Sequence, residues 1–182
     1  AAVVLPTRNG TCMLPLAKTT AALVFASTYY LLCVGSICGI YLAMLGPDGA
    51  GLPCQIFDFA SPYPYSVGAV CGLCLLVGYV VCLGATAFTL LLSSKLRSVM
   101  PVAVVPLAVI LLGILGKLIT PLAKIADLTP MTGFNDMFSA MVSYAAGPIV
   151  FDLPSMLALL YGALLAACVP LSIRMFRRHQ VM

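Results

Sequence analysis

The sequence contains no tryptophan, no glutamate and a single histidine among its 182 residues. Charged residues make up 8% of the chain, against about 25% in an average soluble domain. It has no recognisable Ser-His-Asp arrangement, no HExxH motif, no paired carboxylates inside an apolar stretch and no Gly-rich phosphate loop. These absences argue against hydrolytic chemistry, intramembrane proteolysis and nucleotide binding, so we do not expect an enzyme, a cofactor or a metal site.

Apolar residues dominate what is present. They make up 63% of the chain, whereas an average soluble domain has roughly 45–50%. A chain of this length and composition cannot cover its surface with polar groups, so we expect it to be surrounded by lipid. Its net charge of +4 comes from basic residues scattered at the ends of apolar stretches, and we therefore expect no nucleic acid partner.

Four apolar stretches are long enough to cross the roughly 30 Å hydrocarbon core of a bilayer, which takes about 20 helical residues. We predict an all-α polytopic membrane protein with spans at about 19–46, 66–93, 100–120 and 153–173, cytoplasmic segments 1–18, 94–99 and 174–182, and outer loops 47–65 and 121–152. Within residues 117–154, apolar residues recur every three or four positions. This spacing predicts one or two short amphipathic helices, broken at Pro130 and Gly133, that lie in the membrane interface or extend into it.

The distribution of charge predicts the topology. Residues 93–98 form the only charged interruption between Phe59 and Gly116, which is typical of a tight cytoplasmic turn between two spans. All five aspartates fall on the opposite side, together with Lys117 and Lys124. The basic residues on the side of the turn are Arg8, Lys18, Lys95, Arg97, Arg174, Arg177 and Arg178. This positive-inside pattern predicts that both ends of the sequence are cytoplasmic and that the last five of these residues anchor the topology.

Most of the eight cysteines lie inside apolar spans, where a small packing role is usual. Cys71 and Cys74 form a CxxC motif near the outer end of the second span. It leaves open a membrane thiol-disulfide oxidoreductase of four-helix type, which would also need a second cysteine pair in an outer loop, where only Cys54 lies. Small residues four apart would permit close helix packing, as in the pairs Gly35 with Gly39, Gly68 with Gly72 and Gly162 with Ala166.

Four further stretches are informative together. They are Leu5-Pro6-Thr7-Arg8-Asn9-Gly10 followed by Leu16-Ala17-Lys18, then Ser61-Pro62-Tyr63-Pro64-Tyr65-Ser66-Val67-Gly68, then residues 90–98, and finally residues 174–181. In this order and spacing they resemble the C-terminal two-thirds of a permease subunit of the bacterial type-2 ABC exporter family. The resemblance implies six helices, so we expect this sequence to be a fragment that holds the last four. It also implies short outer helices between the last two spans.

The same resemblance implies the partners. A dimer of permease subunits, either two copies or this chain with a related one, would enclose a translocation path in the bacterial plasma membrane. A separate ATPase subunit would bind on the cytoplasmic side, where the loop with Arg8 and Lys18 would contact it. This interpretation makes the chain the transport subunit of an ATP-driven exporter. A non-transporting accessory or immunity membrane protein remains as another hypothesis, beside the oxidoreductase.

The CxxC motif provides the first test. If Cys71 and Cys74 only pack between helices, a thiol-alkylating reagent should label them equally before and after treatment with a reductant, as measured by mass spectrometry. Labelling that rises at both cysteines after reduction would support the oxidoreductase and contradict the permease interpretation.

Overall fold

Four long helices form most of the protein. A computed structural model describes residues 10–56, 58–59, 61–96, 98–139, 141–146 and 148–179. The long helices are α1 (Gly10–Leu45), α2 (Val67–Lys95), α3 (Val99–Gly116) and α6 (Leu153–His179). Each contains an apolar stretch long enough to cross a membrane. The predicted class, an all-α multi-pass membrane protein with four spanning helices, is confirmed.

Two helices extend further than the apolar spans from which they were predicted. α1 begins at Gly10 rather than near residue 19, and Pro15 lies inside it. Pro15 is the sixth residue of α1 and removes one backbone hydrogen bond, but the helix continues through it. α6 ends at His179 rather than near residue 173. Basic residues in its last turns favour this extension because they complement the negative end of the helix dipole.

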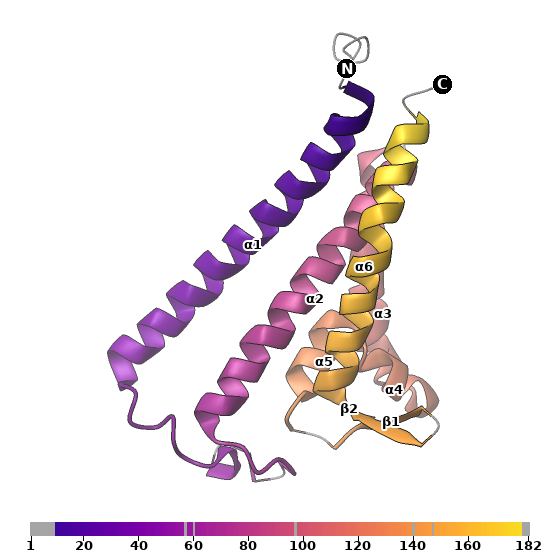
Figure 1. Cartoon of the computed structure of the whole chain (residues 1–182). Helices are drawn as coiled ribbons and strands as arrows, with labels where there is room; N and C mark the ends of the chain where they lie inside the picture. The colour runs from indigo at the N-terminus through magenta and orange to yellow at the C-terminus, as the bar shows by residue number, and fades with distance from the viewer. Residues whose placement is uncertain are drawn as a thin grey trace.

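The helix ends separate into two groups (Figure 1). The start of α1, the end of α6 and the turn between α2 and α3 lie at one end of the molecule. The loop between α1 and α2, which includes the short helix η1 (Cys54–Ile56), lies at the other end. α1 leans away from α2 and α6 toward that second end, and most of its apolar side chains are exposed. We call the first the basic end and the second the outer end.

The chain between α3 and α6 forms a compact structure at the outer end. It contains η2 (Thr120–Leu122), α4 (Ala123–Ala126), α5 (Pro130–Asp136) and a hairpin of β1 (Ser143–Ala146) and β2 (Ile149–Asp152). The strands are antiparallel, with Tyr144 opposite Phe151. One or two short helices broken at Pro130 and Gly133 were predicted here, but Pro130 begins α5 and Gly133 lies within it. Proline suits the first turn of a helix because its missing N–H would be unpaired there. The hairpin was not predicted.

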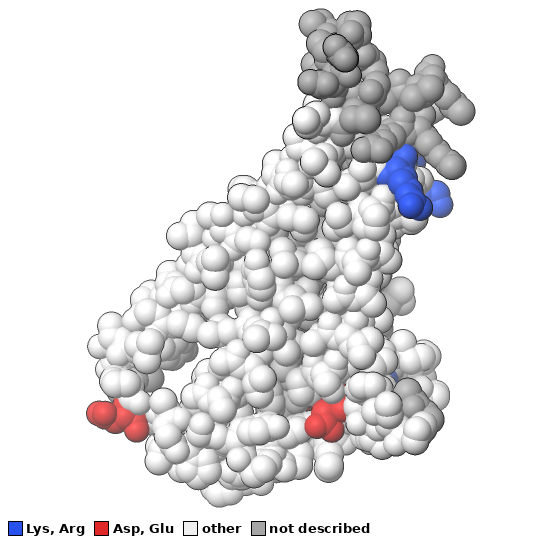
Figure 2. Space-filling view, in the orientation of Figure 1, with Lys and Arg blue, Asp and Glu red and all other residues white. Residues whose placement is uncertain are grey.

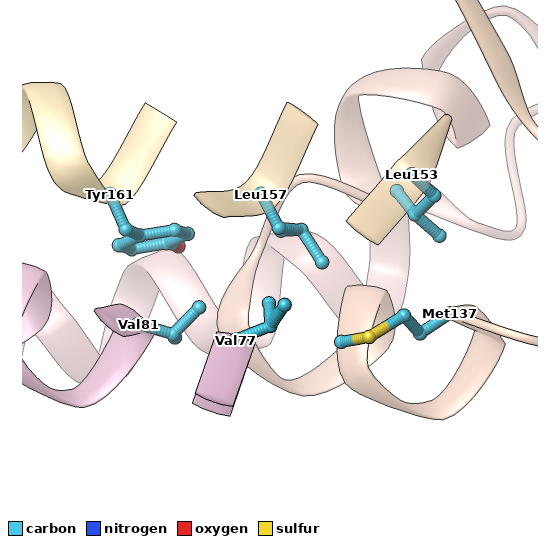
Figure 3. Packing of buried hydrophobic residues seen from close by; sticks show 6 residues of the cluster. All are labelled: Val77, Val81, Met137, Leu153, Leu157 and Tyr161. Atoms are coloured by element: carbon cyan, nitrogen blue, oxygen red, sulfur yellow. The ribbon is translucent and has the colours of Figure 1, made fainter. Parts of the chain in front are cut away.

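The close-packed core lies between α2, α5 and α6 (Figure 3). α6 contributes Leu153, Leu157 and Tyr161 at intervals of four residues, which places them on one face of the helix. They pack against Val77 and Val81 of α2, and Met137, directly after α5, closes the outer end of the cluster. The core is small because most other apolar surface faces outward, as expected where lipid replaces water.

A glycine determines how closely α2 and α6 approach. A Cβ atom placed on Gly84 would lie 2.7 Å from the carbonyl oxygen of Tyr161 and 2.9 Å from its Cβ. By contrast, an added Cβ atom would have no neighbour within 4 Å at four of the glycines that the sequence pairs suggested as packing sites. These are Gly35, Gly39, Gly72 and Gly162. The glycine that allows the tightest contact between these two helices is therefore outside the predicted pairs.

This difference gives a matched pair of substitutions on one helix. Gly84→Ala should destabilise the fold by about 1–3 kcal/mol, because the added methyl group must separate two backbones. Gly72→Ala should be neutral or slightly stabilising, since its Cβ enters open space and alanine favours the helix. Unfolding of both variants in detergent micelles, followed by circular dichroism, measures the difference. Equal stabilities would show that the α2–α6 contact is not this close.

Candidate functional site

The charged side chains gather at the two ends of the molecule (Figure 2). Lysine and arginine form a patch at the basic end, whereas aspartates lie at the outer end. The stretches of α1, α2, α3 and α6 between these ends contain no Lys, Arg, Asp or Glu. Any functional chemistry of charged groups is therefore confined to the two ends, and we describe each in turn.

At the basic end, α1 contacts α6. Lys18 of α1 is exposed, and its Nζ atom lies 5.8 Å from the centroid of the Phe176 ring on α6. A cation at this distance over an aromatic face is attracted to it. Next to Lys18, Thr19 is buried and its hydroxyl donates to the carbonyl of Pro15 at 2.7 Å. The first turns of α1 are thus held beside the end of α6, with the lysine directed outward.

The turn between α2 and α3 joins the same end. Lys95 is the last residue of α2 and is exposed. The neighbouring Ser94 is buried, and its hydroxyl approaches Met175 Sδ of α6 at 3.9 Å. Arg174, directly before Met175 in α6, is exposed. Three basic regions far apart in the sequence therefore meet around the last turns of α6.

The other predicted site residues can be placed only in part. Arg177 and Arg178 lie in the last turns of α6, but their side chains are outside the described part of the structure, as are Arg8 and Arg97 altogether. Of the two residues proposed to contact an ATPase, the structure therefore places only Lys18. Phe176 was not singled out from the sequence. A phenylalanine among arginines does not by itself indicate a contact site, and its role is visible only once α1 is seen to lie beside it.

At the outer end, residues 117–139 extend inward between the long helices, and we call this segment the outer insert. α5 contacts α2, α3 and α6. The hydroxyl of Tyr161 donates to the carbonyl of Leu128 at 3.1 Å. Tyr161 lies eight residues after the start of α6, which corresponds to about 12 Å of helix. The turn between α4 and α5 therefore reaches below the outer end of the spanning helices.

The carbonyl groups in this turn are bonded by side chains. The hydroxyl groups of Thr129 and Thr132 both donate to the carbonyl of Ala126, and the two hydroxyls are 2.7 Å apart. Gly113 of α3 lets this turn approach, because any side chain there would collide with Thr129. Non-helical backbone at membrane depth is tolerated only where protein groups satisfy it. In the outer insert, hydroxyl groups of Thr129, Thr132 and Tyr161 provide such partners to the carbonyls of Ala126 and Leu128.

An ion-pair cluster attaches the insert to the end of α3. Lys117, directly after α3, lies 3.2 Å from Asp127 Oδ1 and also pairs with Asp136. The Asp127 side chain is only 9% exposed, compared with 34% for Lys117. Tyr144 of β1 donates to the carbonyl of Lys124, and burial together with the charge of Asp127 raises the pKa of its phenol. One cation thus holds two elements of the insert against the membrane-spanning core.

Among the cysteines whose side chains the structure describes, none forms a disulfide. Cys71 is exposed and Cys74 is partly buried on α2. Cys54 in the outer loop is buried, and its thiol donates to the carbonyl of Tyr63 at 3.1 Å. The seven cysteines whose side chains are described are all free thiols. The thiol of Cys54 is therefore used in packing and in a hydrogen bond.

Removing the positive charge of Lys117 should weaken the attachment of the outer insert to α3. Lys117→Met leaves the buried Asp127 without its partner, which should cost about 1–3 kcal/mol in unfolding free energy. Asp127→Asn in the same chain should restore part of the loss, because it removes the unpaired charge. Lys124→Met is the control, since Lys124 is exposed and its contact with Tyr144 uses only the backbone. Thermal unfolding in micelles compares them, and equal losses for both lysines would contradict the proposed role of the ion pairs.

The comparisons with known proteins add no identification. No protein-family model matches the chain, and no curated protein and no solved structure matches it. The function is therefore argued from the geometry of the two ends and the helices between them.

Proposed function

We propose that the chain is a permease subunit of an ATP-driven exporter of the type-2 ABC class, which shares a translocation path with a second permease subunit. The observation that supports this most is the outer insert. Short helices between the last two spans are what the family resemblance implies, and α4 and α5 occupy that place, packed against α2, α3 and α6. An ordinary connecting loop would not need the buried Thr132, the partly buried Thr129 and the close contact with Gly113 that hold this segment against the long helices.

The helices between the two ends favour transport driven from elsewhere. Ion-coupled carriers usually contain acids or bases within the membrane, and the four spanning stretches contain none. Polar groups there are hydroxyls and thiols, such as the Ser27 and Tyr79 hydroxyls, which are 2.9 Å apart across α1 and α2. A subunit without Lys, Arg, Asp or Glu in its helices between the two ends is consistent with a pathway opened by a partner that hydrolyses ATP.

The basic end is the proposed contact for that partner. Lys18 is exposed beside Phe176, and Lys95 is exposed at the turn between α2 and α3. By the positive-inside pattern this end faces the cytoplasm, where an ATPase subunit would bind. Because the start of α1 packs against the last turns of α6, a push on Lys18 would be transmitted to both helices. This arrangement supports a coupling role for the segment that holds Arg8 and Lys18.

The proposal predicts that charge reversal at the basic end releases the ATPase subunit from this chain. When the tagged chain is purified from membranes of its own host, vanadate-sensitive ATP hydrolysis should co-purify with it. Arg8→Glu and Lys18→Glu should reduce that activity at least tenfold, while the amount of chain inserted in the membrane stays the same.

Lys124→Glu is the matched control, because it reverses an exposed lysine at the outer end and should leave the co-purified activity unchanged. The proposal is wrong if the unmodified chain brings no ATPase activity with it, or if all three variants behave alike.

A further inference from the structure

A pocket opens where the close-packed core ends. Figure 3 shows Tyr161 and Val81 at one limit of the core cluster. On the side of α3, Tyr161 also lines a pocket of about 190 Å³. The pocket lies between α2, α3 and α6, and Pro130 at the start of α5 forms part of its wall. Ala85 and Phe88 of α2 and Pro106 and Ile110 of α3 line it as well.

The chemistry of the lining limits what can occupy the pocket. Its wall is almost entirely apolar, and the hydroxyl of Tyr161 is already bonded to Leu128. An apolar cavity of about 150 Å³ in a soluble protein stays free of water and accepts a molecule of the size of benzene. A pocket of this size and lining therefore suits a hydrocarbon group, whereas it offers no partner to a charged or hydrogen-bonding ligand.

The position of the pocket identifies the source of that group. Phe88 and Lys95 lie two helical turns apart on the same side of α2, a distance of about 10 Å along the helix axis. Half of the hydrocarbon core of a bilayer is about 15 Å thick. A lipid whose headgroup lies at Lys95 can therefore place part of an acyl chain in the pocket. The pocket is partly open, and Val109 at its wall is 39% exposed, so a chain can enter from the bilayer.

The charge of Lys95 selects the headgroup. Lys95 is exposed, and neither ion pair found among the described residues includes it. An exposed lysine at a membrane surface attracts anionic lipids. We propose that the pocket between α2, α3 and α6 binds one acyl chain of an anionic phospholipid, whose headgroup is held at Lys95. This site does not depend on the proposed export function.

The absence of tryptophan makes a direct test possible, because a single introduced tryptophan has no background. Phe88→Trp places the reporter in the pocket. Phe25→Trp is the matched control: Phe25 is 72% exposed on α1 and follows Lys18 by seven residues, the same interval that separates Phe88 from Lys95. Phosphatidylglycerol with brominated acyl chains, added to each protein in detergent micelles, quenches the fluorescence of a tryptophan that it contacts.

We expect quenching of the Phe88→Trp protein to saturate at about one lipid per chain, whereas quenching of the Phe25→Trp protein should follow the mole fraction of brominated lipid. Adding Ala85→Leu or Leu164→Phe, which fill the pocket from α2 and α6, should remove the saturable part. Unchanged helical content by circular dichroism will show that these variants are folded. Lys95→Gln should weaken the binding of phosphatidylglycerol about fivefold and that of phosphatidylcholine much less.

Three results would contradict the proposal. If both reporters follow the same unsaturable curve, the pocket meets lipid only as the rest of the surface does. If the Phe25→Trp protein is quenched and the Phe88→Trp protein is not, another protein surface covers the pocket. Equal affinity for phosphatidylglycerol and phosphatidylcholine, unchanged in Lys95→Gln, would refute the role of the anionic headgroup.

Discussion

The close contact of Tyr161 with Gly84 is the constraint on which the rest of the structure depends. It brings the backbones of α2 and α6 together, and the same tyrosine donates its hydroxyl to Leu128 in the outer insert. Tyr161 thus lies at the closest approach of two long helices, and its hydroxyl satisfies a carbonyl of the turn that packs against them.

The ion pairs at Lys117 have a different role, because they lie where α3 leaves the apolar layer. A lone lysine would be stable in the headgroup region, but a buried Asp127 requires a partner. Lys117, Asp127 and Asp136 together hold the insert at a fixed depth beside α3. Hydroxyl groups and ion pairs therefore act on the same turn: the hydroxyls donate to its carbonyls, and Lys117 pairs with its aspartate.

The long helices could be predicted from the sequence, but the contacts between them could not. Long apolar stretches without charge predict spanning helices, since lipid permits few alternatives. The class, the four long helices and short helices before the last of them were found as expected. Glycine pairs four residues apart did not identify the packing site, because Gly84 pairs with a tyrosine on another helix. Contacts such as those of Lys18 with Phe176 and Lys117 with Asp127 join separate elements, and no local pattern encodes them.

The two ends of the molecule are connected through few residues. The pocket wall contains Phe88 and Pro106, which lie toward the basic end, and Pro130, with which α5 of the outer insert begins. Tyr161 lines the same pocket and bonds to the turn of the insert. Whatever fills the pocket therefore touches α2, α3 and the insert together. Pro130 at the start of α5 shares this wall with residues of α2 and α3, so a movement of either helix that narrowed the pocket would change the packing of the outer insert.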